Sequence, residues 1–238
     1  MSRLAIVCSL LAGLSSVAAA DRAYEAPPHE APHFAQPPSA APHAQRAEPA
    51  PDFMEGIVVD RASVRAALMQ VRASNLNAFR AYQQAGVFPS NTFKGRKLNV
   101  WRDEDGHFCA AATIIKLSGD DALVDRVAEQ SNFIRLADVR QGPLMDWILS
   151  SGFTQEEIAM IQEPFMPVAR PQPIEPSKPI IDARLRKAED ARLRAKYTQV
   201  DKDLVKFQAR SLDLAVDRLM KHQDLAWNLV QTHTMPPE

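Results

Sequence analysis

The stretch Leu98–Gly119, LNVWRDEDGHFCAAATIIKLSG, is the part of the chain from which the fold is best inferred. It contains one of the three tryptophans, the cysteine Cys109 and the densest apolar run after the first 20 residues. Its first five residues predict a short strand, and the DEDG segment that follows predicts a tight turn in which Gly106 takes a positive φ. His107–Cys109 then returns along the strand. The stretch therefore predicts one β-hairpin.

The second half of this stretch, residues 110–117, is ambiguous between helix and strand. Ala110–Ala112 favour a helix, whereas Thr113–Ile115 favour a strand. Ser118-Gly119 is typical of a helix C-terminus, so a buried, alanine-rich helix is the preferred prediction and a strand is the alternative.

A long amphipathic helix is predicted before the hairpin, over residues 60–84. Asp60 is suited to cap its first turn, and Gly86 follows its end, as a left-handed cap would. Apolar residues recur with helical spacing from Val64 to Tyr82. Four arginines gather along one flank of this apolar stripe: Arg61, Arg65, Arg72 and Arg80.

Three further helices are predicted after residue 119. Asp120-Asp121 places acids in the first turn of one, and Gly142-Pro143 begins the next with proline at its first position. Thr154 to Glu157 is a capping box, which opens a third helix. The fold class is therefore mainly α: a small helical module with one β-hairpin, followed by a long C-terminal helix or helical hairpin.

The N-terminus has the pattern of a secretory signal. Arg3 precedes an uncharged apolar stretch, and Ala18-Ala19-Ala20 supplies the small residues of a cleavage site before Asp21. Residues 1–20 are interpreted as a signal peptide, which predicts an exported, periplasmic or secreted protein without a membrane span after cleavage. An uncleaved N-terminal anchor is the alternative, although the stretch barely reaches spanning length.

Proline content divides the remainder of the chain. Residues 21–52 hold eight of the 18 prolines and are predicted to form a disordered, extended Pro/Ala-rich tether. Residues 53–163 form the folded module, and residues 164–179, with six prolines, a second linker. Three histidines of the tether could bind a metal, but they lack carboxylate or thiol partners at fixed geometry: His29, His33 and His43.

Residues 180–235 contain no proline or glycine and are predicted to form a charged helix. Its apolar seam runs from Leu193 to Leu219 and slips after Phe207. A continuous rod and an αα-hairpin broken near Thr198-Gln199 are both compatible with this pattern. Such a helix could bind a protein partner or a second copy. Residues 180–196 carry six basic and three acidic groups, so contact with an anionic envelope surface is possible, although a solvated face explains them more simply.

Charge and cysteine content exclude several classes of protein. The formal net charge is −1, and cleavage after Ala20 leaves 27 basic against 29 acidic residues, a net charge of −2. Neither value indicates nucleic-acid binding. Cleavage also removes Cys8, so Cys109 would be the single cysteine and no internal disulfide could form.

Two weak candidate sites lie in the predicted hairpin. His107 and Cys109 would share a face of a strand and could form an activated thiol, but no orienting group or oxyanion site is evident. Asp103 and Asp105 resemble part of a calcium loop, yet the loop register would place Trp101 and Ala112 where acids are required. A polar turn and a buried small cysteine explain these residues more simply.

The functional hypothesis follows from this layout. No phosphate-binding loop, zinc-protease motif or nucleophile elbow is present in the sequence, and no cofactor is implied. Trp101 and Trp147 are expected to be core residues. We therefore expect an exported, non-enzymatic envelope protein that acts as an interaction or scaffold module. The alternatives are a thiol-dependent enzyme or hydrolase that uses Cys109 and His107, and a cell-wall carbohydrate binder.

Overall fold

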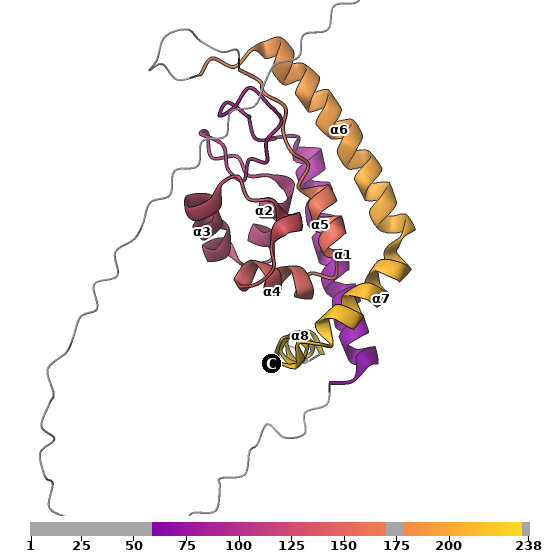
Figure 1. Cartoon of the computed structure of the whole chain (residues 1–238). Helices are drawn as coiled ribbons and strands as arrows, with labels where there is room; N and C mark the ends of the chain where they lie inside the picture. Colours follow the sequence, from indigo (N-terminus) through magenta and orange to yellow (C-terminus); the bar gives the residue numbers. More distant parts are fainter. Residues whose placement is uncertain (1–58, 170–178, 235–238) are drawn as a thin grey trace, which may run out of the picture. The chain divides into compact units, whose positions relative to one another are not determined.

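The computed structural model of the chain describes residues 59–169 and 179–234. This part is mainly α-helical, as the sequence predicts, with eight α-helices and one short 3-10 helix (Figure 1). The elements, in chain order, are α1 (Arg61–Ala85), α2 (Ala110–Leu117), α3 (Asp121–Ser131), η1 (Leu136–Asp138), α4 (Pro143–Ser150), α5 (Gln155–Ile161), α6 (Ala183–Lys206), α7 (Gln208–Leu219) and α8 (Gln223–Thr234). The predicted signal peptide, the whole predicted tether with its histidines, and residues 53–58 of the predicted module lie outside the described residues.

Helix α1 is the spine of the fold, and α2, α6, α7 and α8 all contact it (Figure 1). Its first turn is capped by Asp60, whose carboxylate accepts a hydrogen bond from the Ser63 amide at 2.8 Å. Its last turn ends at Gly86, which has φ +63° and donates its amide to the Tyr82 carbonyl. Both caps are as the sequence predicts, because each depends on a residue next to the helix.

The predicted β-hairpin is not shown, and the described residues contain no β-sheet. The turn itself forms, with Gly106 at φ +86°, but pairing across it is limited to one isolated bridge between Arg102 and Phe108. Leu98, at the start of the predicted strand, pairs with Phe165 instead, and its amide and carbonyl both bond that residue. The two ends of the predicted first strand therefore pair with different segments, so no two continuous strands pair with each other.

Residues 110–117 form helix α2, which confirms the preferred prediction. The helix begins after Cys109, whose Sγ accepts a hydrogen bond from the Ala112 amide at 3.5 Å. Its alanines and both isoleucines are buried. This burial holds Thr113–Ile115 in a helix despite their β-branched side chains, because packing overrides a weak intrinsic preference.

The C-terminal segment is neither one rod nor a hairpin broken at Thr198-Gln199. Helix α6 continues to Lys206 and the direction changes at Phe207, which is 47% exposed. The buried seam runs to Leu204 and resumes at Leu212, eight residues later. Eight helical steps rotate the apolar face by about 80°, so a straight helix would turn Leu212 away from the core. The break at Phe207 returns it to the interior.

Two hydrophobic clusters lie on α1. The larger one joins the C-terminal half of α1 to α2, α3, α4, α5 and the inner face of α6. The smaller one joins the N-terminal half of α1 to α7 and α8. Phe165 and Val168, which belong to the predicted linker 164–179, are also buried. The C-terminal helices thus complete the core of the helical module.

The arginine flank of α1 binds acids of the C-terminal helices. Arg61 pairs with Asp217 at 2.6 Å, and Arg80 pairs with Asp201 at 2.8 Å. Arg65 pairs with Asp213, and Arg72 turns inward. These contacts follow α1 along α7 and α6, so the flank is an interhelical contact. Within the described ranges, every helix is too short or too polar to span a membrane.

Candidate functional site

The polar turn between Trp101 and Cys109 is organised by Asp103, whose side chain is buried. One carboxylate oxygen accepts hydrogen bonds from the amides of Asp105 (3.0 Å) and His107 (2.8 Å). The other lies 2.9 Å from the Ser90 amide and 3.1 Å from Nδ1 of His107. Asp103 therefore fixes the shape of the turn and joins it to the loop after α1.

Asp103, Asp105 and His107 also bring three possible metal-ligand atoms within 4.8 Å of one another. Both oxygens of Asp103 already accept hydrogen bonds from protein N–H groups. A metal ion would compete with those donors for the same lone pairs. The turn explains the cluster without a metal, in agreement with the failed calcium-loop register.

Cys109 lies inside the core, with no exposed surface. Burial raises the pKa of its thiol to about 12, despite the hydrogen bond from the Ala112 amide at the start of α2. His107 is half-exposed and contacts Asp103 instead. A reactive thiol needs a lowered pKa and a path for substrate, and the environment of Cys109 provides neither.

An apolar groove lies beside the turn, between the end of α1 and helix α2. Its volume is about 370 Å³. Val87 is 51% exposed and Leu117 is 62% exposed, so two large apolar side chains stand at its walls in contact with solvent. The remaining lining comes from α1, the turn and α2: Ala81, Tyr82, Ala85, His107, Phe108, Thr113 and Lys116.

Polar groups are placed mainly at the rim of this groove. His107 offers a half-exposed imidazole. Lys116 lies over the Phe108 ring at 5.4 Å and pairs with Asp121 at 3.1 Å. The Thr113 hydroxyl donates to the Cys109 carbonyl at 3.0 Å. This arrangement of apolar walls with a few polar groups suits binding of an apolar side chain.

The floor of the groove is held by aromatic packing. Tyr82 lines the groove and packs against Phe88 and Tyr197, with ring centroids 5.4 Å and 5.7 Å away. Tyr197 belongs to α6, and burial raises the pKa of both tyrosine hydroxyls. The groove is thus built on three segments, with α6 supporting it from behind.

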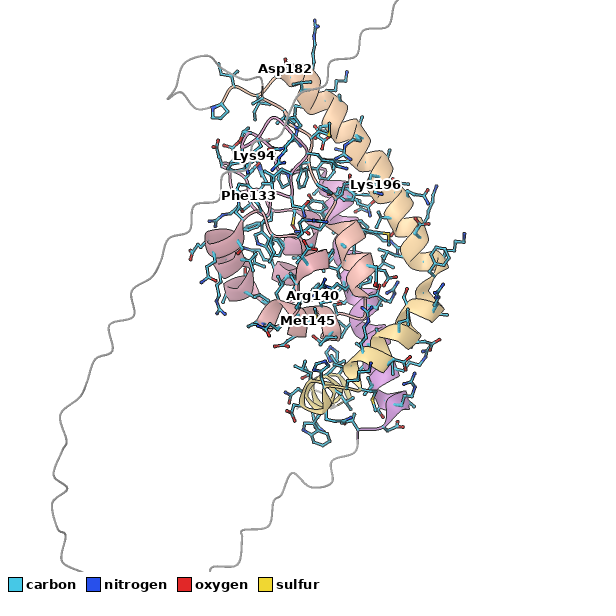
Figure 2. All side chains as sticks on the ribbon, viewed as in Figure 1. Lys94, Phe133, Arg140, Met145, Asp182 and Lys196 are labelled. Carbon is cyan, nitrogen blue, oxygen red and sulfur yellow. The ribbon has the colours of Figure 1, made fainter. Side chains whose placement is uncertain are left out.

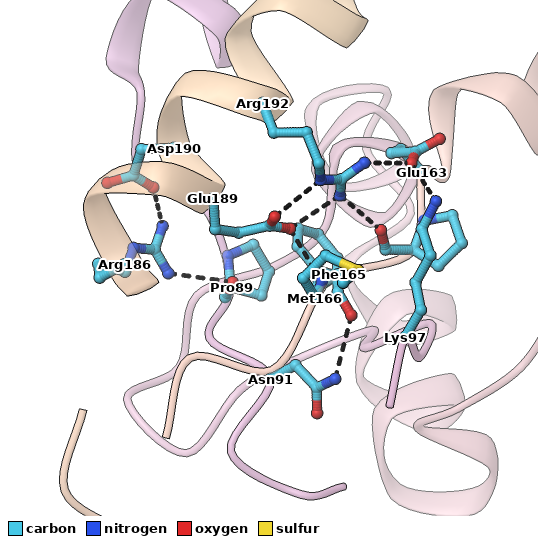
Figure 3. Close-up of polar contacts among 11 residues, drawn as sticks. Pro89, Asn91, Lys97, Glu163, Phe165, Met166, Arg186, Glu189, Asp190 and Arg192 are labelled. Atoms are coloured by element: carbon cyan, nitrogen blue, oxygen red, sulfur yellow. Dashed lines mark hydrogen bonds and ion pairs between the residues drawn. The ribbon is translucent and has the colours of Figure 1, made fainter. Parts of the chain in front are cut away.

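A polar cluster anchors the N-terminal half of α6 to the module (Figure 3). Arg192 donates to Glu189 through Nε (2.7 Å) and to Glu163 through Nη1 (2.6 Å). Lys97 donates to the same Glu163 at 2.7 Å. The Met166 amide donates to Glu189 at 2.9 Å. Residues 163–166 are therefore held to α6 by charge-assisted hydrogen bonds.

The charged groups of this cluster shift one another's pKa values. Burial raises the pKa of Glu163, but hydrogen bonds from Lys97 and Arg192 outweigh it, and the net effect lowers that pKa. The hydrogen bond to Glu189 raises the pKa of Arg192. Both shifts keep the partners charged, as expected for a contact that stabilises the fold.

A second, fully buried ion pair joins Arg72 of α1 to Glu157 of α5. Two parallel hydrogen bonds of 2.8 Å and 2.7 Å connect them. Arg72 also donates to the carbonyls of Gly152 and Leu204, and its guanidinium lies 4.7 Å from the Phe153 ring centroid. Glu157 accepts the Thr154 amide at 2.9 Å, which completes the predicted capping box.

Sequence reasoning missed both the groove and this pair. The capping box indicated that Glu157 faces its own helix terminus, but not that a distant arginine shares its carboxylate. Trp101 and Trp147 are buried, as predicted, so neither ring is available as a sugar platform. The histidines proposed as metal ligands lie outside the described residues: His29, His33 and His43.

Comparisons with known proteins add no family to this description. The chain matches no family model, and no curated protein or solved structure is similar to it.

Proposed function

We propose that the chain is an exported, non-enzymatic protein of a bacterial envelope that acts by binding a protein partner. The signal-peptide pattern of residues 1–20 supports export. The buried thiol of Cys109, with its raised pKa, supports a non-enzymatic role, because it is the cysteine that the thiol-enzyme alternative requires.

The apolar groove between α1 and α2 is the observation that carries this proposal. Val87 and Leu117 are more than half exposed although they adjoin a well-packed core. Covering a large aliphatic side chain contributes up to about 1.5–3 kcal/mol. An apolar side chain of a partner segment would enter between them, and His107 and Lys116 would contact polar groups beside it.

The C-terminal helices offer a second surface for a partner or a second copy of the chain. Trp227 of α8 is 37% exposed and Leu214 of α7 is 41% exposed. Tryptophan is enriched among the residues that dominate protein interfaces. A monomeric mass in light scattering would argue against self-association through these helices.

Site-specific photocrosslinking in cells tests the groove. A photoreactive residue at Leu117 is expected to give a discrete crosslinked species, and Val87→Glu is expected to abolish it by placing a charge in the apolar wall. A photoreactive residue at Met69, which is also half-exposed on α1, is the matched control. Equal crosslinking from both positions, or none from Leu117, would contradict the proposal.

A further inference from the structure

The outward face of α6 carries charge of one sign only. Of the 24 residues of this helix, the exposed charged ones are all basic: Arg184, Lys187, Arg194, Lys202 and Lys206. Its acids are buried or half-buried: Glu189, Asp190, Asp201 and Asp203. A chain with a formal net charge of −1 therefore displays a basic strip along one helix.

The inward position of the acids has a structural cause. Asp201 pairs with Arg80 of α1 at 2.8 Å. Glu189 binds Arg192 and the Met166 amide in the polar cluster that anchors α6. Asp190 pairs with Arg186 of the same helix. The acids of α6 are therefore engaged away from its exposed basic residues.

Four of the five basic residues point in nearly one direction, whereas Arg194 lies about 80° away and its guanidinium packs over the Phe88 ring at 5.6 Å. At 100° per residue, Arg184 and Lys202 lie at the same angle around the helix axis, and Lys187 and Lys206 lie within about 60° of them. The strip follows the whole of α6, a length of about 36 Å. Figure 2 shows side chains of α6 extending away from the rest of the described fold along this helix.

Exposed apolar residues stand at both ends of the basic strip. Ile180 and Leu185, at the N-terminal end, are 66% and 41% exposed. Val205 and Phe207, at the C-terminal end, are 48% and 47% exposed, and Lys206 lies over the Phe207 ring. The residues exposed between the two ends include Ala188, Ala191 and Ala195, which would let the helix approach a flat surface closely.

We propose that this face of α6 docks on an anionic phospholipid surface, with the helix axis parallel to it. Basic side chains would contact lipid phosphates, and Ile180 and Val205, at the two ends, would enter the boundary between headgroups and acyl chains. A charged polysaccharide or a nucleic acid would bind the basic residues but would leave Val205, which lies within about 60° of them around the helix axis, and Ile180 in water. The combination of charge and apolar ends therefore favours a lipid bilayer.

The charge on the other side of the fold supports this orientation. Helix α3, on the opposite side of the fold from α6 in Figure 1, exposes Asp121, Asp125 and Glu129 beside Arg126. Asp121 pairs with Lys116 and Asp125 lies 3.8 Å from Arg102, so the charges on that side are largely balanced. An anionic surface would therefore attract the basic strip of α6 more strongly than α3. The groove between α1 and α2 is formed by other residues, so lipid docking does not depend on the proposed partner site.

Vesicle co-sedimentation of the full chain tests the inference. Vesicles contain phosphatidylcholine alone or equal parts of phosphatidylcholine and phosphatidylglycerol. The triple variant Lys187→Glu, Lys202→Glu, Lys206→Glu is expected to lower the partition onto the anionic vesicles by about 100-fold, from roughly fivefold per basic residue. Raising the salt to about 0.5 M is expected to weaken binding of the parent chain in the same direction.

A matched control reverses three exposed basic residues elsewhere: Arg96, Arg126 and Arg135. This variant has the same net charge as the test variant and is expected to retain binding. The parent chain and both variants contain the apolar stretch of residues 1–20. Any membrane affinity of that stretch is therefore the same in all three and does not affect the comparison between them. If the Glu variant does not fold, the corresponding Lys→Gln triple is expected to show a smaller loss.

Several results would overturn the inference. The parent chain could bind neutral and anionic vesicles equally, or the control variant could lose as much binding as the test variant. Binding to dextran sulfate or DNA with no preference for phosphatidylglycerol vesicles would assign the basic strip to another polyanion. None of these results bears on crosslinking from Leu117, so failure of this inference is distinguishable from failure of the proposed partner site.

Discussion

Arg72 connects three segments that are far apart in the sequence. It binds Glu157 of α5, the carbonyl of Gly152 and the carbonyl of Leu204 at the end of α6. Its side chain is 2% exposed and that of Glu157 is 5% exposed. Removing one partner of such a pair leaves an uncompensated buried charge, which is strongly unfavourable.

We expect Arg72→Met to destabilise the fold by about 3–5 kcal/mol. The measurement is urea denaturation followed by circular dichroism. Arg65→Met is the matched control, because Arg65 also pairs with an acid of the C-terminal helices but is exposed, and its loss should cost about 1 kcal/mol or less. The double variant Arg72→Met, Glu157→Met is expected to recover part of the loss. Equal effects at Arg72 and Arg65 would contradict this account.

Gly152 and Gly106 both have positive φ, at +75° and +86°, but only Gly152 is crowded. An added Cβ at Gly152 would overlap the Leu68 carbonyl and lie 2.7 Å from Cβ of Arg72, whereas nothing lies within 4 Å of one at Gly106. We expect Gly106→Ala to cost roughly 1–2 kcal/mol from backbone strain. Gly152→Ala should cost about 1–3 kcal/mol more through overpacking. Equal melting temperatures for the two variants would show that the overlap relaxes without cost.

The Cys109 thiol is expected to be unreactive in the native protein. It is fully buried and its pKa is raised to about 12, so almost no thiolate is present at neutral pH. Iodoacetamide should label it only after denaturation, as mass spectrometry would detect. Fast labelling of the folded chain, with loss of a phenotype in Cys109→Ala, would instead support the thiol-enzyme alternative.

At the scale of elements, Glu163 makes the attachment of α6 sensitive to acid. Its pKa is lowered in the folded state by Lys97 and Arg192, despite burial. Its contribution is therefore fully present above the ordinary pKa of roughly 4.3 and is lost as the pH falls through the lower folded-state value. We expect Glu163→Gln to cost about 1–2 kcal/mol at neutral pH. The difference from the parent chain, measured by urea denaturation across pH, should vanish in acid; a constant difference would contradict it.

Features that depend on neighbouring residues were predictable from the sequence. The Asp60 and Gly86 caps and the Thr154 capping box each depend on residues next to a helix end. Helix α2 was only the preferred of two predictions, because Ala110–Ala112 and Thr113–Ile115 favour different structures and burial decides between them. The predicted hairpin is not shown: pairing across the turn is confined to the neighbourhood of the Arg102–Phe108 bridge, and Leu98 pairs with the distant Phe165, a partner that no local pattern identifies. In the sequence, the change of helix direction at Phe207 is indicated only by a change in the spacing of the apolar residues after that position.

The candidate site was less predictable than the fold. The sequence located the turn that holds Asp103 and His107, because Asp-Gly is a local turn signal. The sequence could not locate the groove. Its walls include Val87 and Leu117, which belong to two segments that only the packing of the fold brings together. Leu117 belongs to an apolar run that otherwise becomes core, so pattern alone would bury it.

At the scale of the whole molecule, the signal-peptide interpretation of residues 1–20 makes a direct prediction. Cleavage after Ala20 should give an exported form whose N-terminal peptide begins at Asp21. Mass spectrometry of periplasmic and extracellular fractions would detect that peptide, and Ala18→Arg with Ala20→Arg should block its formation. Recovery of intact residues 1–20 from the membrane fraction would favour the uncleaved anchor.

The dependence of α1 on the C-terminal helices has a consequence for when the chain folds. Arg65 and its partner Asp213 are 148 residues apart, and Arg72 and Leu204 are 132 apart. Such distant contacts must close long loops before they stabilise anything, which slows folding. Helix α1 is synthesised well before α7 and α8, so the N-terminal half of its apolar face stays uncovered until those helices emerge. For an exported chain, that delay leaves an unfolded interval in which it could be threaded through a membrane.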